Sequence, residues 1–425
     1  MPVEAEAPAA PQAANSANHQ ITASHSMRQR LESTLLAIWY PQDLSRGFLS
    51  RLLTSLLLIF LLPLSLLYGS FAKRKLAKRR QPGFSNTARP DALIVVVGNI
   101  SVGGTGKTPL LLKLAESLHA RGHRFAVLSR GYGGTHVTQS NTPRWISAGD
   151  LATEVGDEPL LLATELAKLT GDASPMVMIG AKRSLAMQAV LSECTANAKP
   201  IDVILSDDGL QHYALPRDVE YAVVDNARRF GNRRLLPAGP LREPVARLGL
   251  CDAIVVNGAD TEHGFELAGF LAIGMQVNIV ALRKLAAAPG DDAARYDASE
   301  VQQALAGKSL VIAVAALGNP SRFFDGVQQL LLRHAPDTRL VLAAFADHHA
   351  YSANDFEKLA HVHSPGGDAL FLVTGKDAVK CLPFAARMPL DCLVGEVDVQ
   401  VHDTMLQPML EGLQQLEKWR AEYKV

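Results

Sequence analysis

The sequence predicts an α/β protein: a mostly parallel sheet domain, a second, smaller α/β domain, and an N-terminal membrane-associated helix. Three observations predict this arrangement. Short apolar runs alternate with helix-length segments, which is the pattern of parallel strands covered on both faces. A glycine-rich loop follows the first of these runs, and an uncharged stretch of 21 residues lies upstream of all of them.

Composition bounds the class of protein. The chain has 425 residues, 48% of them hydrophobic and 20% charged, a globular composition with room for two or three domains. It carries 42 basic and 42 acidic side chains, which argues against a protein that binds nucleic acid with its whole surface. Four cysteines without a C-x-x-C spacing predict neither a disulfide framework nor a zinc site.

The first 90 residues differ in character from the rest. Residues 1–26 are rich in Ala, Pro, Asn, Gln and Ser and have almost no large apolar side chains, so we expect a disordered extension there. Residues 1–90 carry 11 basic and four acidic groups, against 31 and 38 in the remainder. The balanced total therefore conceals a basic N-terminal end and an acidic body.

Residues 27–90 are predicted to form a membrane-associated helix with a basic flank. Leu52–Ala72 is 21 residues without a charge, ten of them Leu, which is about the length needed to cross a bilayer core. Lys73–Arg80 follows with six positive charges in eight residues, and such a run favours the cytoplasmic side. A buried core helix and a helix embedded in one leaflet are the two alternatives.

Residues 91–270 are predicted to form the first α/β domain. A helix is expected over Leu110–His119. The connections between parallel strands should be right-handed crossovers. The predicted strands are Leu93–Val97, Arg124–Ser129, Met176–Ile179, Ile201–Ser206, Tyr221–Asp225 and Ala253–Val256.

The boundary between the two domains is predicted where the strand pattern is weaker. Residues 271–295 are the expected linker region, and residues 296–425 the expected second α/β domain. Strands are expected at Leu310–Ala315, Arg339–Ala344 and Ala369–Val373. Apolar residues at helical spacing predict a final helix over Leu406–Trp419 that packs on a core.

The glycine-rich loop indicates nucleotide binding. Gly98–Pro109 reads G-N-I-S-V-G-G-T-G-K-T-P between a strand and a helix, close to the phosphate-loop consensus G-x-x-x-x-G-K-[ST]. The Lys107 ammonium would reach the β- and γ-phosphates of ATP, and the Thr108 hydroxyl would ligate Mg²⁺. The first domain is thus P-loop NTPase-like. The residues expected around the phosphates are Ser101, Val102, Gly103, Gly104, Thr105, Gly106, Lys107 and Thr108.

Carboxylates occur at two points near this loop. Asp207 and Asp208 end a predicted strand, where a metal site is favoured over a simple turn because Mg²⁺ needs hard oxygen ligands. Asp157 and Glu158 stand at a probable helix start, where composition alone favours a helix-dipole role.

Two further segments are ambiguous from their residues alone. Leu235–Pro244, L-L-P-A-G-P-L-R-E-P, presents Arg242 either as a phosphate clamp or in a solvated loop. In Phe345–Tyr351, F-A-D-H-H-A-Y, Asp347 beside His348 could be an oriented histidine or a surface turn.

Taken in order, these segments resemble the tetraacyldisaccharide 4′-kinases, the lipid A 4′-kinases of Gram-negative bacteria. The resemblance covers nearly everything from Met27 to the C-terminus. It rests on the phosphate loop together with S-R-G-Y-G-G (Ser129–Gly134), V-G-D-E-P, S-D-D-G-L-Q-H, L-L-P-A-G-P-L-R-E-P, G-N-P-S-R-F-F (Gly318–Phe324), F-A-D-H-H-A-Y and K-D-A-V-K (Lys376–Lys380).

The resemblance implies ATP-dependent phosphorylation of the 4′-hydroxyl of a tetraacylated glucosamine disaccharide 1-phosphate, forming the 1,4′-bisphosphorylated precursor of lipid A. The implied place is the inner membrane, with the catalytic domain on the cytoplasmic side. The implied cofactors are ATP and Mg²⁺. The implied partners are the lipid substrate and the membrane surface, with no nucleic acid and no obligate protein partner. A two-stranded linker would join the two domains around an active-site cleft.

The resemblance also assigns roles. It makes Asp157 the general base on the sugar hydroxyl, with His348 as its partner. Lys107 and Arg242 would act on the phosphates. The metal ion would be bound by Thr108, Asp207, Asp208 and Glu158. His212 would complete the charged pocket. Two positions depart from the family pattern: Gly375 replaces a usual Glu, and Arg233 replaces a usual Gly.

Two other functions compete with this hypothesis. A membrane-bound P-loop NTPase switch would hydrolyse nucleotide to control a partner, but Val102 stands where the partitioning ATPases carry a signature lysine. A soluble small-molecule kinase would use the apolar segment as a core helix, which the adjacent basic run disfavours.

Overall fold

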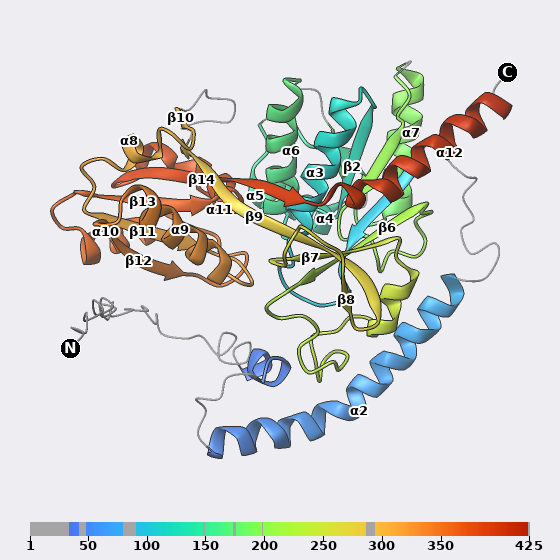
Figure 1. Ribbon diagram of the computed structural model, residues 1–425, viewed down its shortest axis with the longest axis horizontal. Helices are drawn as coiled ribbons and strands as arrows, with labels where there is room; N and C mark the ends of the chain where they lie inside the picture. Colours follow the sequence, from blue (N-terminus) through green and yellow to red (C-terminus); the bar gives the residue numbers. More distant parts are fainter. Residues whose placement is uncertain are drawn as a thin grey trace, which may run out of the picture.

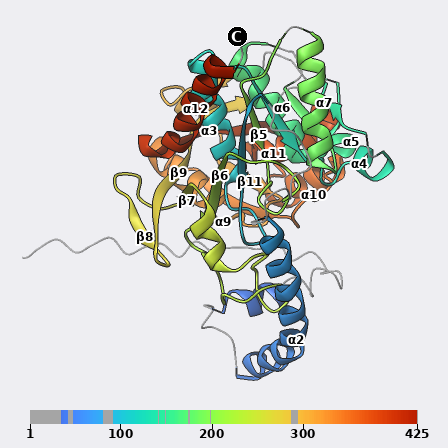
Figure 2. The same ribbon diagram turned by 90° about the vertical axis from the view of Figure 1, so that its right-hand side faces the viewer.

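The computed structural model describes residues 34–41, 48–79 and 91–423, apart from 141, 148, 173–175, 198 and 286–293. The extension predicted over residues 1–26 lies outside the described residues. Residues 34–39 are helical, and α2 (Phe48–Arg79) follows as a separate long helix. Figures 1 and 2 show α2 lying at the outside of the molecule, apart from the sheet.

One continuous path of hydrogen-bonded strands runs through the body, in the order β12-β11-β13-β14-β9-β7-β6-β1-β5-β2-β4-β3. The large, mostly parallel sheet predicted from the sequence is confirmed. Its first half contains β1 (Leu93–Gly98), β2 (Phe125–Ser129), β3 (Arg144–Trp145), β4 (Val177–Ile179), β5 (Val203–Ser206), β6 (Val219–Asp225) and β7 (Ala253–Asn257). Its second half contains β11 (Leu310–Ala315), β12 (Arg339–Ala344) and β13 (Ala369–Thr374).

Helices cover both faces of each half, which is why the strands are apolar without alternation. In β1, Val95 and Val97 pack with Leu110 and Leu114 of α3 on one face, whereas Ile94 packs in the cluster of α7 on the other. The helices of the first half are α3 (Lys107–Ala120), α4 (Thr135–Gln139), α5 (Ala152–Val155), α6 (Asp157–Thr170) and α7 (Arg183–Ala196). Those of the second are α8 (Val301–Leu305), α9 (Ser321–His334), α10 (Ala353–His363) and α11 (Gly375–Cys381).

Two long antiparallel strands connect the halves. β9 (Phe270–Lys284) pairs with β7 near its start, and β14 (Asp391–Val401) pairs with β13 near its start. The two strands pair with each other over most of their length, with an irregularity at Glu396/Val397. Figure 1 shows this pair crossing between the halves, and the short strands β8 (Phe265–Leu267) and β10 (Arg295–Tyr296) flank β9.

The final helix, α12 (Gln407–Tyr423), follows the second half in sequence but packs on the first. Its Met409 and Leu413 join the same apolar cluster as β1. Arg420 at its end forms ion pairs with Asp91 at 2.9 Å and with Asp202 at 2.7 Å. The helix predicted over Leu406–Trp419 is therefore present, and it closes the core of the phosphate-loop half rather than that of residues 296–425.

Helix α2 does not match the alternative of a buried core helix. Its segment Ser55–Ala77 is long and apolar enough to cross a membrane, and only 11% of its most apolar window is buried. The exposed side chains include Phe60 at 76% and Leu66 at 74%. An apolar surface of this length left uncovered by protein fits a lipid environment.

Candidate active site

A cleft of about 2230 Å³ lies between the two halves. The parallel strands of both halves point their carboxyl ends toward it, so the loops that follow β1, β5, β12 and β13 all contribute lining residues. Ligands of open α/β sheets bind at this end of the strands because the loops and helix N-termini converge there. The linker strands β9 and β14 line the remaining wall.

The glycine-rich segment that the sequence predicts to be a phosphate loop joins β1 to the first turn of α3. Gly106 has φ 95°, and a Cβ at this position would lie 2.2 Å from Asn257 Nδ2, so only glycine fits. The Asn257 amide donates a hydrogen bond to the Thr105 carbonyl at 3.1 Å and fixes the loop from the end of β7. The N-terminus of α3 begins at Lys107 without a side-chain cap, which suits anion binding.

Asp208 is held between two cations. Arg242 Nη1 lies 2.9 Å and 3.0 Å from its two carboxylate oxygens, and Lys107 Nζ lies 3.6 Å away. Burial would raise the pKa of Asp208, but Lys107 and Arg242 hold it well below its usual range. The structure therefore brings together three residues that the sequence separates widely.

Asp207, its neighbour, lies in the opposite electrostatic situation. Its side chain is buried, one oxygen accepts a hydrogen bond from Ser129 Oγ at 3.3 Å, and Oδ1 has no hydrogen-bond partner. Burial, and then the nearby Glu158 carboxylate, raise the pKa of Asp207 to about 6. An unpartnered buried carboxylate oxygen at a phosphate site fits a divalent cation.

Asp157 and His348 meet across the cleft. Asp157 is the first residue of α6, and His348 lies in the loop between β12 and α10. His348 Nδ1 is 3.0 Å from Asp157 Oδ2, and the Tyr132 ring packs edge-on against the imidazole. Burial opposes the charged form of Asp157, yet His348 and Lys376 lower its pKa below the ordinary value. The same hydrogen bond raises the pKa of His348.

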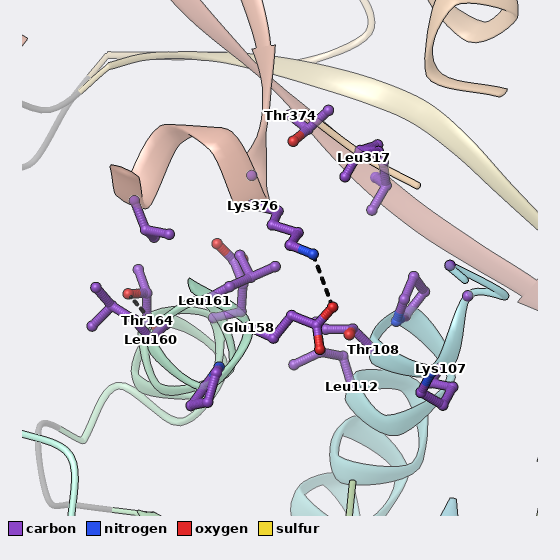
Figure 3. Close-up of a pocket in the computed structure, with 18 of the residues that line it drawn as sticks. Lys107, Thr108, Leu112, Glu158, Leu160, Leu161, Thr164, Leu317, Thr374 and Lys376 are labelled. Atoms are coloured by element: carbon purple, nitrogen blue, oxygen red, sulfur yellow. Dashed lines mark hydrogen bonds and ion pairs between the residues drawn. The ribbon is translucent and has the colours of Figure 1, made fainter. Parts of the chain in front are cut away.

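Lys376, to which the sequence assigned no role, lies among three carboxylates. Its Nζ is 2.9 Å from Glu158 Oε1, and Figure 3 shows this ion pair as a dashed line. The same Nζ is 3.5 Å from Asp347 Oδ1 and 3.7 Å from Asp157 Oδ2. Burial alone would lower the pKa of this lysine, but the three carboxylates raise it. The motif K-D-A-V-K could have identified Lys376 from the sequence, because its first lysine follows closely after the end of the predicted strand β13.

Glu158 and His212 complete the predicted set. Burial would raise the pKa of Glu158, but Lys376 and Lys107 lower it, so this half-buried carboxylate is stabilised in its charged form by the ion pair with Lys376. His212 lines the same cleft, and burial, followed by the charges of Arg183 and Arg130, lowers its pKa to about 4. His212 is therefore a neutral hydrogen-bonding group at neutral pH.

Arg322 was also missed by reasoning from the sequence. It belongs to G-N-P-S-R-F-F on α9, and its Nη2 lies 2.9 Å from Asp225 Oδ2 and 2.5 Å from the Asn257 carbonyl. Because Asn257 also bonds Thr105, this arginine connects the second half to the phosphate loop. Gly318 of the same motif packs close to the backbone of Gly104.

The two departures from the family pattern have visible surroundings. Arg233 has φ 61°, in the left-handed region that favours the glycine expected there. Gly375 begins α11 directly before Lys376, and the Thr374 hydroxyl caps that helix by accepting the Asp377 amide.

Comparison with known proteins gives a consistent result. The family model described as tetraacyldisaccharide-1-P 4′-kinase matches residues 57–415. The tetraacyldisaccharide 4′-kinase of Pseudomonas syringae pv. syringae (strain B728a) is 42% identical over 354 residues, covering 81% of this chain and 93% of the relative. That of Azoarcus sp. (strain BH72) is 40% identical over 361 residues, covering 84% and 92%.

The fold is similar to a solved structure as well. LpxK from Aquifex aeolicus in complex with ATP has a TM-score of 0.61 at 23% identity, covering 85% of this chain and 99% of the solved chain. Family match, curated relatives and fold agree over the whole catalytic body. The chain belongs to the tetraacyldisaccharide-1-P 4′-kinase family.

Proposed function

We propose that this kinase uses the cleft to transfer the γ-phosphoryl group of ATP to the 4′-hydroxyl of a tetraacylated glucosamine disaccharide 1-phosphate, with Asp157 as general base. The observation that carries the proposal is the Asp157–His348 pair, in which His348 lines the same cleft as the predicted phosphate loop. Family membership favours this reaction over the NTPase switch and over the soluble small-molecule kinase.

The chemical step follows from these positions. An Asp157 oxygen accepts the proton of the 4′-hydroxyl as the hydroxyl oxygen attacks the γ-phosphorus. The bond from the γ-phosphorus to the β,γ-bridging oxygen breaks, and ADP is released. A carboxylate with a lowered pKa is a weak base, so His348 assists by taking up the proton through Nδ1. Lys107 and Arg242 neutralise the charge that develops on the phosphates.

The carboxylates beside the phosphate loop suit a magnesium ion. Among the described residues, no three His, Cys, Asp or Glu side chains form a ready-made metal cage. Mg²⁺ usually needs only one or two carboxylates, with phosphate oxygens and waters as its other ligands. The free Oδ1 of Asp207 and the Thr108 hydroxyl would hold it, with Asp208 and Glu158 nearby. Bound there, it would neutralise charge on the β- and γ-phosphates.

The membrane supplies the acceptor in this proposal. A tetraacylated disaccharide stays anchored in the bilayer by its chains, so the enzyme must work at the membrane surface. Helix α2 supplies such an attachment through its exposed apolar side chains and the basic residues of its C-terminal end. We place this attachment on the cytoplasmic face of the inner membrane. A lipid substrate and a lipid surface are the only partners that the proposal requires.

The test uses the full-length protein, labelled ATP, Mg²⁺ and the tetraacyl disaccharide 1-phosphate in detergent micelles. We expect labelled bisphosphorylated lipid from the wild-type protein. Asp157→Asn should lower kcat by about 100-fold or more while leaving ATP binding nearly unchanged. Hydrolysis of ATP without labelled lipid would contradict the kinase proposal, and a large loss of ATP affinity in Asp157→Asn would make Asp157 a nucleotide ligand.

A further inference from the structure

Helix α2 turns one stripe of side chains toward the catalytic body. Ser65 and Gly69 are buried, and Leu62, Tyr68 and Ala72 at helical spacing around them are half-buried. The opposite side is exposed, with Leu64, Leu66, Leu67 and Phe71 between 54% and 74% accessible. An otherwise apolar helix thus keeps a serine and a tyrosine on the side that faces protein.

Both polar side chains bond to the same loop. Ser65 Oγ donates to the Leu235 carbonyl at 2.7 Å, and the Tyr68 hydroxyl donates to the Arg242 carbonyl at 3.0 Å. Ser70, by contrast, donates to the Leu66 carbonyl of its own helix. A phenol directed at protein needs such a partner, because an unpaired buried hydroxyl is costly.

The other side of this loop bonds to the entrance of the phosphate loop. The Arg242 amide donates to the Ile100 carbonyl at 2.7 Å, and the Val102 amide donates to the Pro240 carbonyl at 2.9 Å. Ser101 and Leu241 form an isolated β-bridge between the two segments. The loop of residues 235–242 therefore lies between helix α2 and the predicted phosphate loop, and the main chain of Arg242 bonds to both.

We propose that Tyr68 is a positioning residue for phosphoryl transfer, since its hydroxyl holds the main chain of Arg242 so that the guanidinium stays on Asp208. The inference rests on the proposed function, in which Arg242 acts on the phosphates. The Arg242 carbonyl and guanidinium belong to one residue, so a shift of the carbonyl displaces Nη1 from both Asp208 oxygens. Seating of the helix in lipid is thereby coupled to the geometry of the phosphate site.

The test is Tyr68→Phe, which keeps the ring and removes the hydroxyl. We expect kcat for lipid phosphorylation to fall about three- to tenfold, the effect of losing one hydrogen bond, with the melting temperature unchanged. Binding to vesicles of phosphatidylethanolamine and phosphatidylglycerol should also be unchanged, because the exposed apolar side is intact. The matched control, Ser70→Ala, removes a hydroxyl that donates within α2 and should leave kcat, the melting temperature and vesicle binding unaltered.

A double-mutant cycle separates positioning from simple helix docking. In an Arg242→Ala background the carbonyl is still present but the guanidinium is gone, so Tyr68→Phe should cause no further loss of kcat. An equal loss in both backgrounds, or a Tyr68→Phe variant as active as wild type, would overturn the positioning role alone. A wild-type protein that phosphorylates no lipid would overturn the proposed function and this inference together.

Discussion

His348 Nδ1 lies 3.0 Å from Asp157 Oδ2, although 191 residues separate them in the chain. The two side chains come from different halves of the sheet, so the pair exists only when the halves face each other across the cleft. In the proposed function, the general base and its histidine partner are therefore contributed by different halves of the molecule.

The pair fixes the direction of the pH dependence. The hydrogen bond to Asp157 raises the pKa of His348 above its ordinary 6.5, so the pair keeps a proton at acidic pH and cannot accept another from the sugar hydroxyl. We therefore expect kcat/KM to rise as the pH increases through this raised pKa. In His348→Ala the remaining acid limb belongs to Asp157, whose pKa lies below its ordinary value, so the limb should move to lower pH and the plateau should be up to about 100-fold lower. A pH–rate profile checks this, and an acid limb that does not move would exclude His348 from the proton transfer.

Lys376 should be needed for stability as well as for the protonation state of Asp157. Lys376→Met leaves Glu158, Asp157 and Asp347 without their common cation, so we expect a loss of about 3 kcal/mol in the free energy of unfolding. The acid limb of the pH–rate profile should also move upward, because the charge of Lys376 lowers the pKa of both His348 and Asp157.

Lys168→Met is the matched control, since it removes an exposed i,i+3 pair with Glu165 on α6 and should change stability by less than about 0.5 kcal/mol. Urea unfolding of the two variants makes the comparison. Equal stability of both would show that the buried lysine does not hold the carboxylates together.

Asp207 should govern the magnesium requirement. Asp207→Asn removes the buried charge whose Oδ1 lacks a partner, and the Mg²⁺ concentration for half-maximal activity should rise about tenfold or more. Asp398→Asn changes an exposed carboxylate that lines the same cleft from β14 and should leave the Mg²⁺ titration unaltered. If both variants titrate like wild type, the ion is not held by Asp207.

Arg322 should link nucleotide affinity to the contact between the halves. Arg322→Met removes the ion pair with Asp225 and the bond to the Asn257 carbonyl, so the KM for ATP should rise several-fold and stability should fall by about 1–3 kcal/mol. Arg333→Met, an exposed change in the last turn of the same helix, is the control. ATP titration and thermal unfolding measure the two effects, and an unchanged KM would argue against the link.

The sequence by itself determined the short apolar strands of both halves, the glycine-rich loop and the apolar helix, because each is a local pattern. β11 and β12 begin and end at the predicted residues, since a buried parallel strand is a continuous apolar run bounded by polar residues. β14 was not predicted: it alternates polar and apolar residues, and its partner β9 is more than 100 residues away in the chain. The sequence also placed α12 with the second half, because position in the chain carries no information on which core a helix covers.

Only the tertiary structure decided which charges meet. Asp157 is at a helix start and His348 is in a loop, and nothing local distinguishes a catalytic pair from a dipole-stabilising carboxylate and a surface turn. Lys376 and Arg322 are ordinary basic residues in sequence, and they become central because strand ends from both halves converge on one cleft. Electrostatic interactions depend on distance in space, which the order of residues along a chain does not record.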